Sequence, residues 1–157
     1  MPKFKVQHLP GTYALILFAD ADRSISIGKL GRFAVPPGFY VYVGSACGPG
    51  GLSARIAHHA KISQRPHWHM DYLRPALHLK EVWYSYDASG HEHRWANAMD
   101  GLKGATKPIA GFGSSDCSCT SHLFAFSVRP SIRLFRDMLH SQCNVHSKNN
   151  IHSEKWR

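Results

Sequence analysis

The 157-residue chain lacks several features that would assign it to a known functional class. It has no run of about 18 apolar residues, so the sequence predicts no transmembrane helix. Acidic residues are scarce, with 10 Asp and Glu against 19 Lys and Arg, and no two carboxylates are spaced for a two-metal site. The P-loop, dinucleotide-binding, nucleophile-elbow and zinc-protease motifs are all missing. Any hydrolytic site would therefore depend on one carboxylate and some other proton acceptor.

Cysteine is also sparse, and no secretory signal is expected because residues 1–5 lead into no apolar segment. We therefore expect a cytoplasmic protein with reduced thiols rather than a disulfide framework. Zinc is not expected, because the cysteine spacing differs from the usual C-x2-C pair. A zinc-stabilised interaction domain is the alternative, with candidate ligands at Cys117, Cys119, His122 and Cys143.

Positive charge is abundant. The formal net charge is +9 and the isoelectric point is about 9.7. These values favour an anionic partner, with nucleic acid first and an acidic membrane surface second. A hydrophobic content of 43% excludes disorder over most of the chain. We expect a single domain over residues 1–143, followed by a polar, flexible tail over residues 144–157.

Hydrophobic patterning predicts an α+β (α/β) fold. The continuous apolar run at 13–18 is typical of a strand buried on both faces, and the alternation at 24–27 indicates a half-buried strand. Together with the aromatic and β-branched stretch at 39–43, these strands predict an antiparallel meander. Two further strands are expected at 80–86 and 123–128. Helices are expected at 52–61, 67–73 and 91–102 and from Pro130 onward. The expected architecture is a small, mainly antiparallel sheet flanked by helices.

Four side chains form a candidate catalytic set. Tyr13 belongs to a Gly-Thr-Tyr motif at the start of the first predicted strand, and Tyr42 begins a Tyr-Val-Gly motif at the end of the third. A meander would place both tyrosines on one sheet. Arg55 lies on the following predicted helix, and Glu92 lies on a later one.

With this ordered set the chain resembles the GIY-YIG nuclease family. It is more closely similar to a branch of that family that is catalogued as a domain of unknown function and associated with endonuclease III. The resemblance covers roughly residues 10 to 128. The closer match is carried by Tyr40–Ala46, Gly50–Leu52 with Arg55 and His59, His67–Leu73, Gly111–Cys117 and Ser121–Leu123.

The resemblance implies a GIY-YIG-like fold and metal-dependent hydrolysis of DNA phosphodiester bonds. Tyr13 and Tyr42 correspond to the tyrosines of the two family motifs, Arg55 to the helix arginine, and Glu92 to the glutamate that holds one divalent ion, Mg²⁺ or Mn²⁺. The implied partner is DNA, including branched or damaged forms.

The residue types suit phosphodiester chemistry. A tyrosine titrates near pH 10, so a base role at neutral pH requires a nearby cation that lowers the pKa of the phenol. Arg55, or the metal through a bound water, would supply that field, and Arg55 would also bind a phosphate oxygen. His59 lies one turn beyond Arg55 and is a candidate proton relay or phosphate ligand.

Basic and hydroxyl-bearing side chains near these motifs are the candidate nucleic-acid contacts. A phosphate backbone is recognised mainly by such groups and by backbone amides. The candidates are Lys61, Arg65, His69, Lys107, Ser114, Ser115 and His122.

Alternative interpretations stay open at several positions. Ser89 and Glu92 fit a capping box, which would give the glutamate a purely local role. His67 and Asp71 are four residues apart and form a second candidate site that would share a metal or a proton. A catalytically inactive nucleic-acid-binding module is the alternative function. It is motivated by Thr12, where the family has isoleucine, and by the long stretch between the two tyrosines.

Overall fold

The computed structural model describes residues 5–87, 91–114, 119–142 and 150–156. Their main element is a five-stranded antiparallel sheet in the order β6-β4-β1-β5-β7. Its strands are β1 (Gly11–Ala19), β4 (Gly38–Ala46), β5 (His78–Tyr86), β6 (Leu123–Phe126) and β7 (His152–Lys155). A separate two-stranded ribbon consists of β2 (Arg23–Ile27) and β3 (Gly31–Val35). The predicted mixed α+β class is confirmed.

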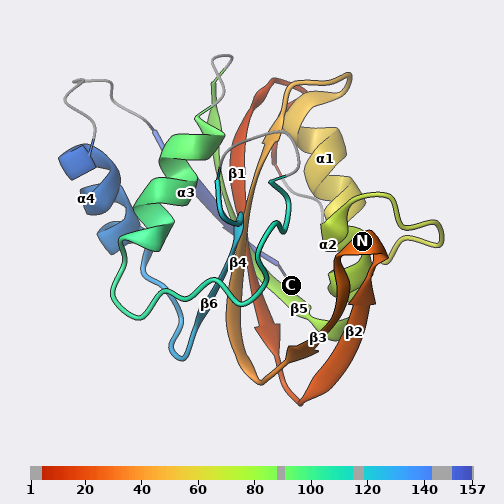
Figure 1. The fold of residues 1–157 in the computed structure, drawn as a ribbon. Coiled ribbons are helices and arrows are strands. Elements are labelled where there is room, and N and C mark those ends of the chain that lie inside the picture. The colour runs from red at the N-terminus through yellow and green to blue at the C-terminus, as the bar shows by residue number, and fades with distance from the viewer. Residues whose placement is uncertain (1–4, 88–90, 115–118, 143–149, 157) are drawn as a thin grey trace.

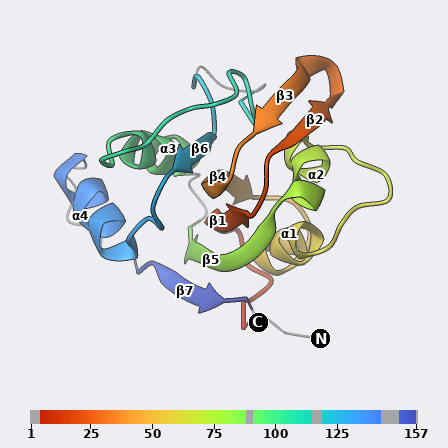
Figure 2. The same cartoon turned by 90° about the horizontal axis from the view of Figure 1, so that it is seen from below.

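Helices cover both faces of the sheet. In Figures 1 and 2, α1 (Gly51–Ala60) and α2 (His69–Leu73) lie on one side of β1, and α3 (Glu92–Asp100) and α4 (Ile132–Gln142) lie on the other. Short 3₁₀ turns occur at Gly28–Leu30 and Arg74–Ala76. None of the helices described is long and apolar enough to cross a bilayer.

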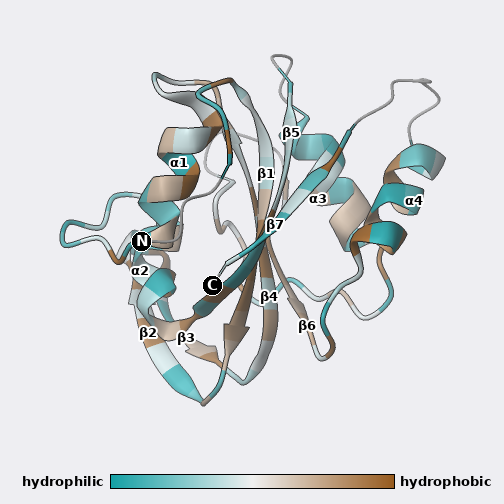
Figure 3. Cartoon of the chain, turned by 180° about the vertical axis from the view of Figure 1, so that it is seen from behind, coloured by the Kyte–Doolittle hydropathy of each residue, from teal (hydrophilic) through white to brown (hydrophobic). Residues whose placement is uncertain are grey.

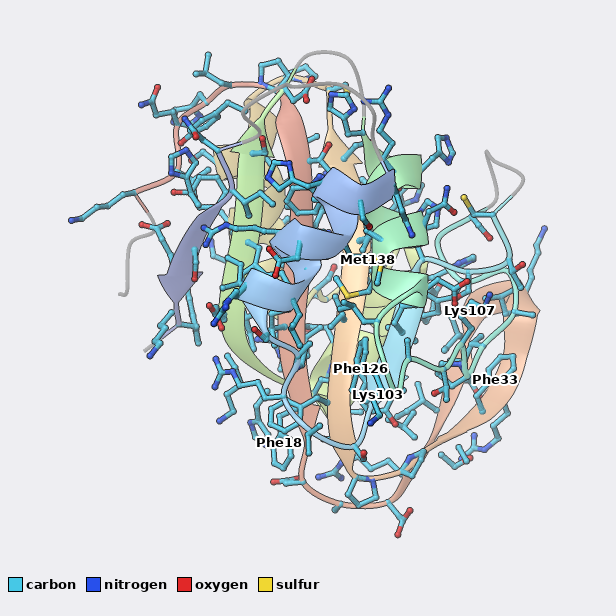
Figure 4. All side chains as sticks on the ribbon, turned by 90° about the vertical axis from the view of Figure 1, so that its left-hand side faces the viewer. Phe18, Phe33, Lys103, Lys107, Phe126 and Met138 are labelled. Carbon is cyan, nitrogen blue, oxygen red and sulfur yellow. The ribbon has the colours of Figure 1, made fainter. Side chains whose placement is uncertain are left out.

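Strand β1 explains the continuous apolar run in the sequence. Its odd-numbered side chains, such as Leu15, belong to the core under α1 and α2. Its even-numbered side chains, such as Ile16, belong to the core under α3 and α4, where Met138 of α4 also packs (Figure 4). Because successive side chains of a strand point to opposite faces, a strand between two helical layers must be apolar throughout.

The predicted meander is wrong in one respect. Strand β1 pairs directly with β4, and β2 pairs with β3 in the separate ribbon, which projects beside α2 (Figure 2). Strand β3 is not among the strands predicted from the sequence. The alternating pattern of β2 leaves one of its faces exposed, so it is unsuited to a position inside a sheet that is covered on both faces. The ribbon therefore accommodates the long stretch between the two tyrosine motifs.

The expected flexible tail is wrong for residues 150–156. Strand β7 extends the sheet along β5, and Ile151 is only 6% exposed. Figure 3 shows that β7 is hydrophilic along its length, so the segment lacks the apolar pattern that would predict a strand. The hydroxyl of Ser153 donates to the Glu81 carboxylate of β5, which fixes the edge strand in place. Residues 143–149 lie outside the described part of the chain.

Candidate active site

A cavity of about 420 Å³ opens at the end of the sheet where β1 begins and β4 ends. All four side chains of the predicted catalytic set line it, although they come from β1, β4, α1 and the start of α3. The complete lining is Tyr13, Tyr42, Ser45, Arg55, His67, Trp68, His69, Glu92 and Gly113.

The pairing of β1 with β4 brings the two tyrosines together. Tyr13 lies opposite Gly44, and Tyr42 lies opposite Leu15, so both phenols are on the same face of the sheet. Their ring centroids are 6.2 Å apart. A Cβ atom at position 44 would lie 2.5 Å from the Tyr13 hydroxyl oxygen, so the Tyr13 ring can lie across β4 only because residue 44 is glycine.

His59 is the hydrogen-bond partner of the first tyrosine. Its Nε2 lies 2.8 Å from the Tyr13 hydroxyl oxygen, and the side chain is 1% exposed. Burial, followed by the nearby His58, lowers the pKa of His59 to about 3, so its imidazole is neutral at physiological pH. Its Nδ1 has no hydrogen-bond partner among the described residues. The structure thus places His59 behind Tyr13 rather than in direct contact with a phosphate.

Both phenols are protonated at neutral pH. Burial raises the pKa of Tyr13 and of Tyr42 well above the usual value. The positive charge of Arg55 opposes this shift at both rings but does not overcome it. The expectation that this cation lowers the phenol pKa enough for a free base is therefore wrong in the absence of a ligand, because desolvation has the larger effect.

Arg55 presents its guanidinium to the cavity from the middle of α1. The guanidinium carbon lies 4.3 Å from the centroid of the Trp68 ring, in the geometry of a cation–π contact. Within the described part of the chain, no carboxylate forms an ion pair with Arg55. Its charge is therefore available to an anionic ligand.

Trp68 is held in place by the buried carboxylate of Asp71. One oxygen of Asp71 accepts the backbone N–H groups of His67 and Trp68, and the other lies 2.7 Å from Nε2 of His58. Burial opposes ionisation of Asp71, but these three hydrogen bonds outweigh it and lower the pKa. The second candidate site is thus wrong in its pairing, because the side-chain partner of Asp71 is His58 and not His67.

Glu92 reaches the cavity beyond the end of the β4–β6 pairing. The pairing of β6 with β4 ends at Tyr42, so the last residues of β4 do not pair with β6. One Glu92 carboxylate oxygen lies 2.8 Å from Nδ1 of His122, and the other accepts a hydrogen bond from the Ser45 hydroxyl at 3.1 Å. Burial disfavours the charged carboxylate, but the contacts with His122 and Ser45 outweigh it and hold the pKa of Glu92 below its usual value.

The capping-box interpretation of Glu92 is wrong. Helix α3 begins at Glu92 with His91 as its N-cap, so the carboxylate is one position into the helix rather than three. Ser89, the other half of that predicted box, lies outside the described residues. A carboxylate at this position still interacts favourably with the positive end of the helix dipole.

The donor set at Glu92 fits one hard divalent ion. Each of its oxygens accepts one hydrogen bond and keeps further lone-pair capacity, and the side chain is 24% exposed. No other acidic side chain lines the cavity in the part of the chain that the structure describes. Mg²⁺ typically binds through one or two carboxylates, retains several waters and takes its other ligands from phosphate oxygens.

Four of the predicted nucleic-acid contacts lie in the cavity or at the surface. His69 lines the cavity and accepts the Gly113 backbone N–H at its Nδ1, at 2.9 Å. Lys61 and Arg65 are exposed just beyond α1. Lys107, in the loop after α3 (Figure 4), forms an ion pair with Asp100 at 3.1 Å.

Two of the other predicted contacts, Ser114 and His122, are buried. Ser114 is 7% exposed and His122 is 1% exposed, so neither side chain is available to a phosphate. His122 instead contacts Glu92. Ser115 lies outside the described residues, as do Cys117 and Cys143 of the zinc alternative. Ser45 lines the cavity but is not among the predicted site residues, because it has no distinguishing spacing of its own.

Comparison with known proteins identifies a family. The model of a domain of unknown function, DUF123, matches residues 12–144 and so includes every side chain that lines the cavity. No curated protein and no solved structure matches the chain.

Proposed function

The chain belongs to the DUF123 family, and we propose that it is a metal-dependent endonuclease that hydrolyses DNA phosphodiester bonds in the cavity at the end of β1 and β4. The observation that carries the proposal is the convergence of Tyr13, Tyr42, Arg55 and Glu92 on that one cavity. These residues are the counterparts of the catalytic set of the GIY-YIG nucleases, to which the sequence is similar. The formal net charge of +9 suits a polyanionic substrate.

Arg55 and Tyr42 bind and stabilise the phosphate. The guanidinium of Arg55 donates to phosphoryl oxygens, and its contact with Trp68 fixes its orientation toward the cavity. Tyr42 retains its proton because of burial, so its hydroxyl acts as a neutral donor to an oxygen on which charge develops.

Tyr13 and His59 handle the proton of the attacking water. In the tautomer that carries hydrogen on Nδ1, His59 accepts the Tyr13 hydroxyl hydrogen at Nε2, so the phenolic oxygen is free to accept a hydrogen bond from water. As the water oxygen bonds to phosphorus and the bond from phosphorus to the leaving oxygen breaks, the water proton passes to Tyr13 while the phenolic proton passes to His59. No free phenolate forms in this relay, and the negative phosphate favours the resulting imidazolium.

Glu92 would hold one Mg²⁺ or Mn²⁺, and an ion bound there supplies positive charge to the phosphoryl and leaving oxygens. Ser45 and His122 fix the direction of the carboxylate. His69, whose Nδ1 accepts the Gly113 backbone N–H, lines the same cavity and completes the phosphate-binding surface.

Cleavage of plasmid and branched DNA with Mg²⁺ or Mn²⁺ tests the proposal. Glu92→Gln and Arg55→Ala should each lower the rate by at least about 100-fold, the scale of losing a preorganised charge contact. Asp100→Asn at the far end of α3 and the exposed Arg133→Ala of α4 are matched controls that should keep full activity. Equal rates in all five proteins, or no cleavage by the wild type over a broad substrate panel, would contradict it.

A non-catalytic DNA-binding module is the second candidate. The observation that favours it is the burial of both phenols, which keeps them protonated in the ligand-free protein. Salt-dependent DNA binding that survives Glu92→Gln, without turnover in any protein, would identify this function.

A further inference from the structure

A cluster of metal-binding side chains lies directly behind Glu92. Nδ1 of His93, on α3, lies 3.1 Å from the Cys119 sulfur, in the loop before β6. The buried His122 completes the cluster, and its ring centroid is 6.1 Å from that of His93. One ligand atom from each residue can be chosen so that all three lie within 4.8 Å of one another.

We propose that His93, Cys119 and His122 bind one Zn²⁺ ion. Two imidazoles and a thiolate form a soft donor set that suits zinc and is unsuited to Mg²⁺ or Ca²⁺, which prefer oxygen ligands. The ligands come from two segments that are close in space but separated by 26 positions between His93 and Cys119. A zinc ion would therefore tie the start of α3 to the loop that leads into β6.

Glu92 provides a second, independent indication of a metal site. Its carboxylate lies 2.8 Å from Nδ1 of His122 and so fixes the orientation of the ring. A buried histidine oriented by a carboxylate is the usual arrangement around protein-bound zinc, where the outer carboxylate fixes the tautomer and raises the basicity of the ligand.

The proposed site differs from the zinc alternative considered in the sequence analysis. Two of that alternative's four ligands, Cys117 and Cys143, lie outside the described residues, and His93 enters as a new ligand. His93 gave no signal in the sequence, since its partners follow it by almost thirty positions. The three ligands leave room for a fourth in the tetrahedral geometry of zinc.

Metal content measures the proposal without any nuclease assay. The purified full chain is stripped with a chelator under reducing conditions, dialysed, and titrated with Zn²⁺, and bound metal is measured by elemental analysis. Substitution with Co²⁺ adds a thiolate-to-metal absorption band that reports the sulfur ligand. We expect the wild type to bind one ion per chain. Cys119→Ser should lose both stoichiometric binding and the cobalt band. His93→Ala should lose stoichiometric binding.

Three further variants make the experiment specific. Cys47→Ser removes an exposed thiol elsewhere and should leave zinc content unchanged. His58→Ala alters the other possible group, His58 with His59 and Asp71, and should also retain zinc. Glu92→Gln keeps every ligand and should weaken zinc affinity by about 10- to 100-fold.

Several outcomes would overturn the proposal. These are no bound zinc in the wild type, zinc retained in both His93→Ala and Cys119→Ser, or zinc lost in His58→Ala with the cobalt band absent. Circular dichroism of each stripped variant checks that folding is preserved. The readout is metal content, so failure here leaves the endonuclease proposal standing, and a lack of DNA cleavage leaves the zinc proposal standing.

Discussion

Replacement of the buried His59 should make the protein less sensitive to acid. Its pKa falls from the ordinary 6.5 to about 3 in the folded protein, chiefly because of burial. Between these two values the unfolded chain binds a proton that the folded chain does not, so stability falls as the pH falls. The stabilising effect is complete above pH 6.5 and is lost progressively toward pH 3.

The size of this effect follows from the shift. Each pH unit within the window costs about 1.4 kcal/mol, so lowering the pH to about 5 should remove about 2 kcal/mol of stability through His59 alone. His59→Gln has no titrating ring and keeps a polar group near the Tyr13 hydroxyl. Urea unfolding at about pH 7.5 and about pH 5 gives the free energy of unfolding at each pH.

The comparison must isolate this one histidine from the others. His78→Gln is the matched control, because His78 is exposed and pairs with Asp20 at the surface. The His59 variant should lose about 2 kcal/mol less than the wild type between the two pH values, and the His78 variant should behave as the wild type does. An identical pH dependence in His59→Gln and the wild type would refute the argument that burial keeps this ring neutral.

Three further predictions concern the site and the sheet edge. Gly44→Ala places a Cβ atom 2.5 Å from the Tyr13 hydroxyl oxygen and should destabilise the protein by about 1–3 kcal/mol. Gly48→Ala is the control, because a Cβ atom there meets no atom within 4 Å. Chemical denaturation compares the free energies of unfolding of the two variants. Ser45→Ala removes one hydrogen-bond donor to Glu92, so the pKa of the Glu92 carboxyl should rise. The acid limb of the pH profile of DNA cleavage should then move to higher pH. An unmoved limb would count against the role of Ser45. Ile151→Ala should cost about 2 kcal/mol in thermal or urea unfolding if β7 belongs to the fold, and a change below about 0.5 kcal/mol would contradict that.

The fold elements with strong local periodicity were predictable. The apolar run of β1 and the amphipathic patterns of α1, α3 and α4 indicate their type directly, because the covered faces must be apolar. The topology around β2 was not predictable, since alternation shows that a strand has one buried face but not which strand it joins. Strand β7 left no signal, because it is fixed by backbone pairing at an edge and by side-chain hydrogen bonds.

Of the candidate site, the four side chains of the catalytic set could be predicted from the sequence. Tyr13, Tyr42, Arg55 and Glu92 could be chosen from motifs, and the sheet register and helix positions bring them together. The contacts that orient these side chains could not be predicted in the same way. The Ser45–Glu92 and His122–Glu92 contacts depend on where α3 starts and on how a loop crosses β4, and both are set by tertiary packing.

Glu92 links the two proposed metal sites through one rigid carboxylate. One of its oxygens contacts His122, a proposed zinc ligand, and the other accepts from Ser45 at the cavity wall. An ion that holds the His122 ring would therefore also hold the direction of the carboxylate. The two sites do not contribute equally to cleavage under this arrangement. Removal of zinc would loosen the carboxylate and reduce cleavage in part, whereas replacement of Glu92 would remove the cavity's ligand for the catalytic ion and abolish cleavage.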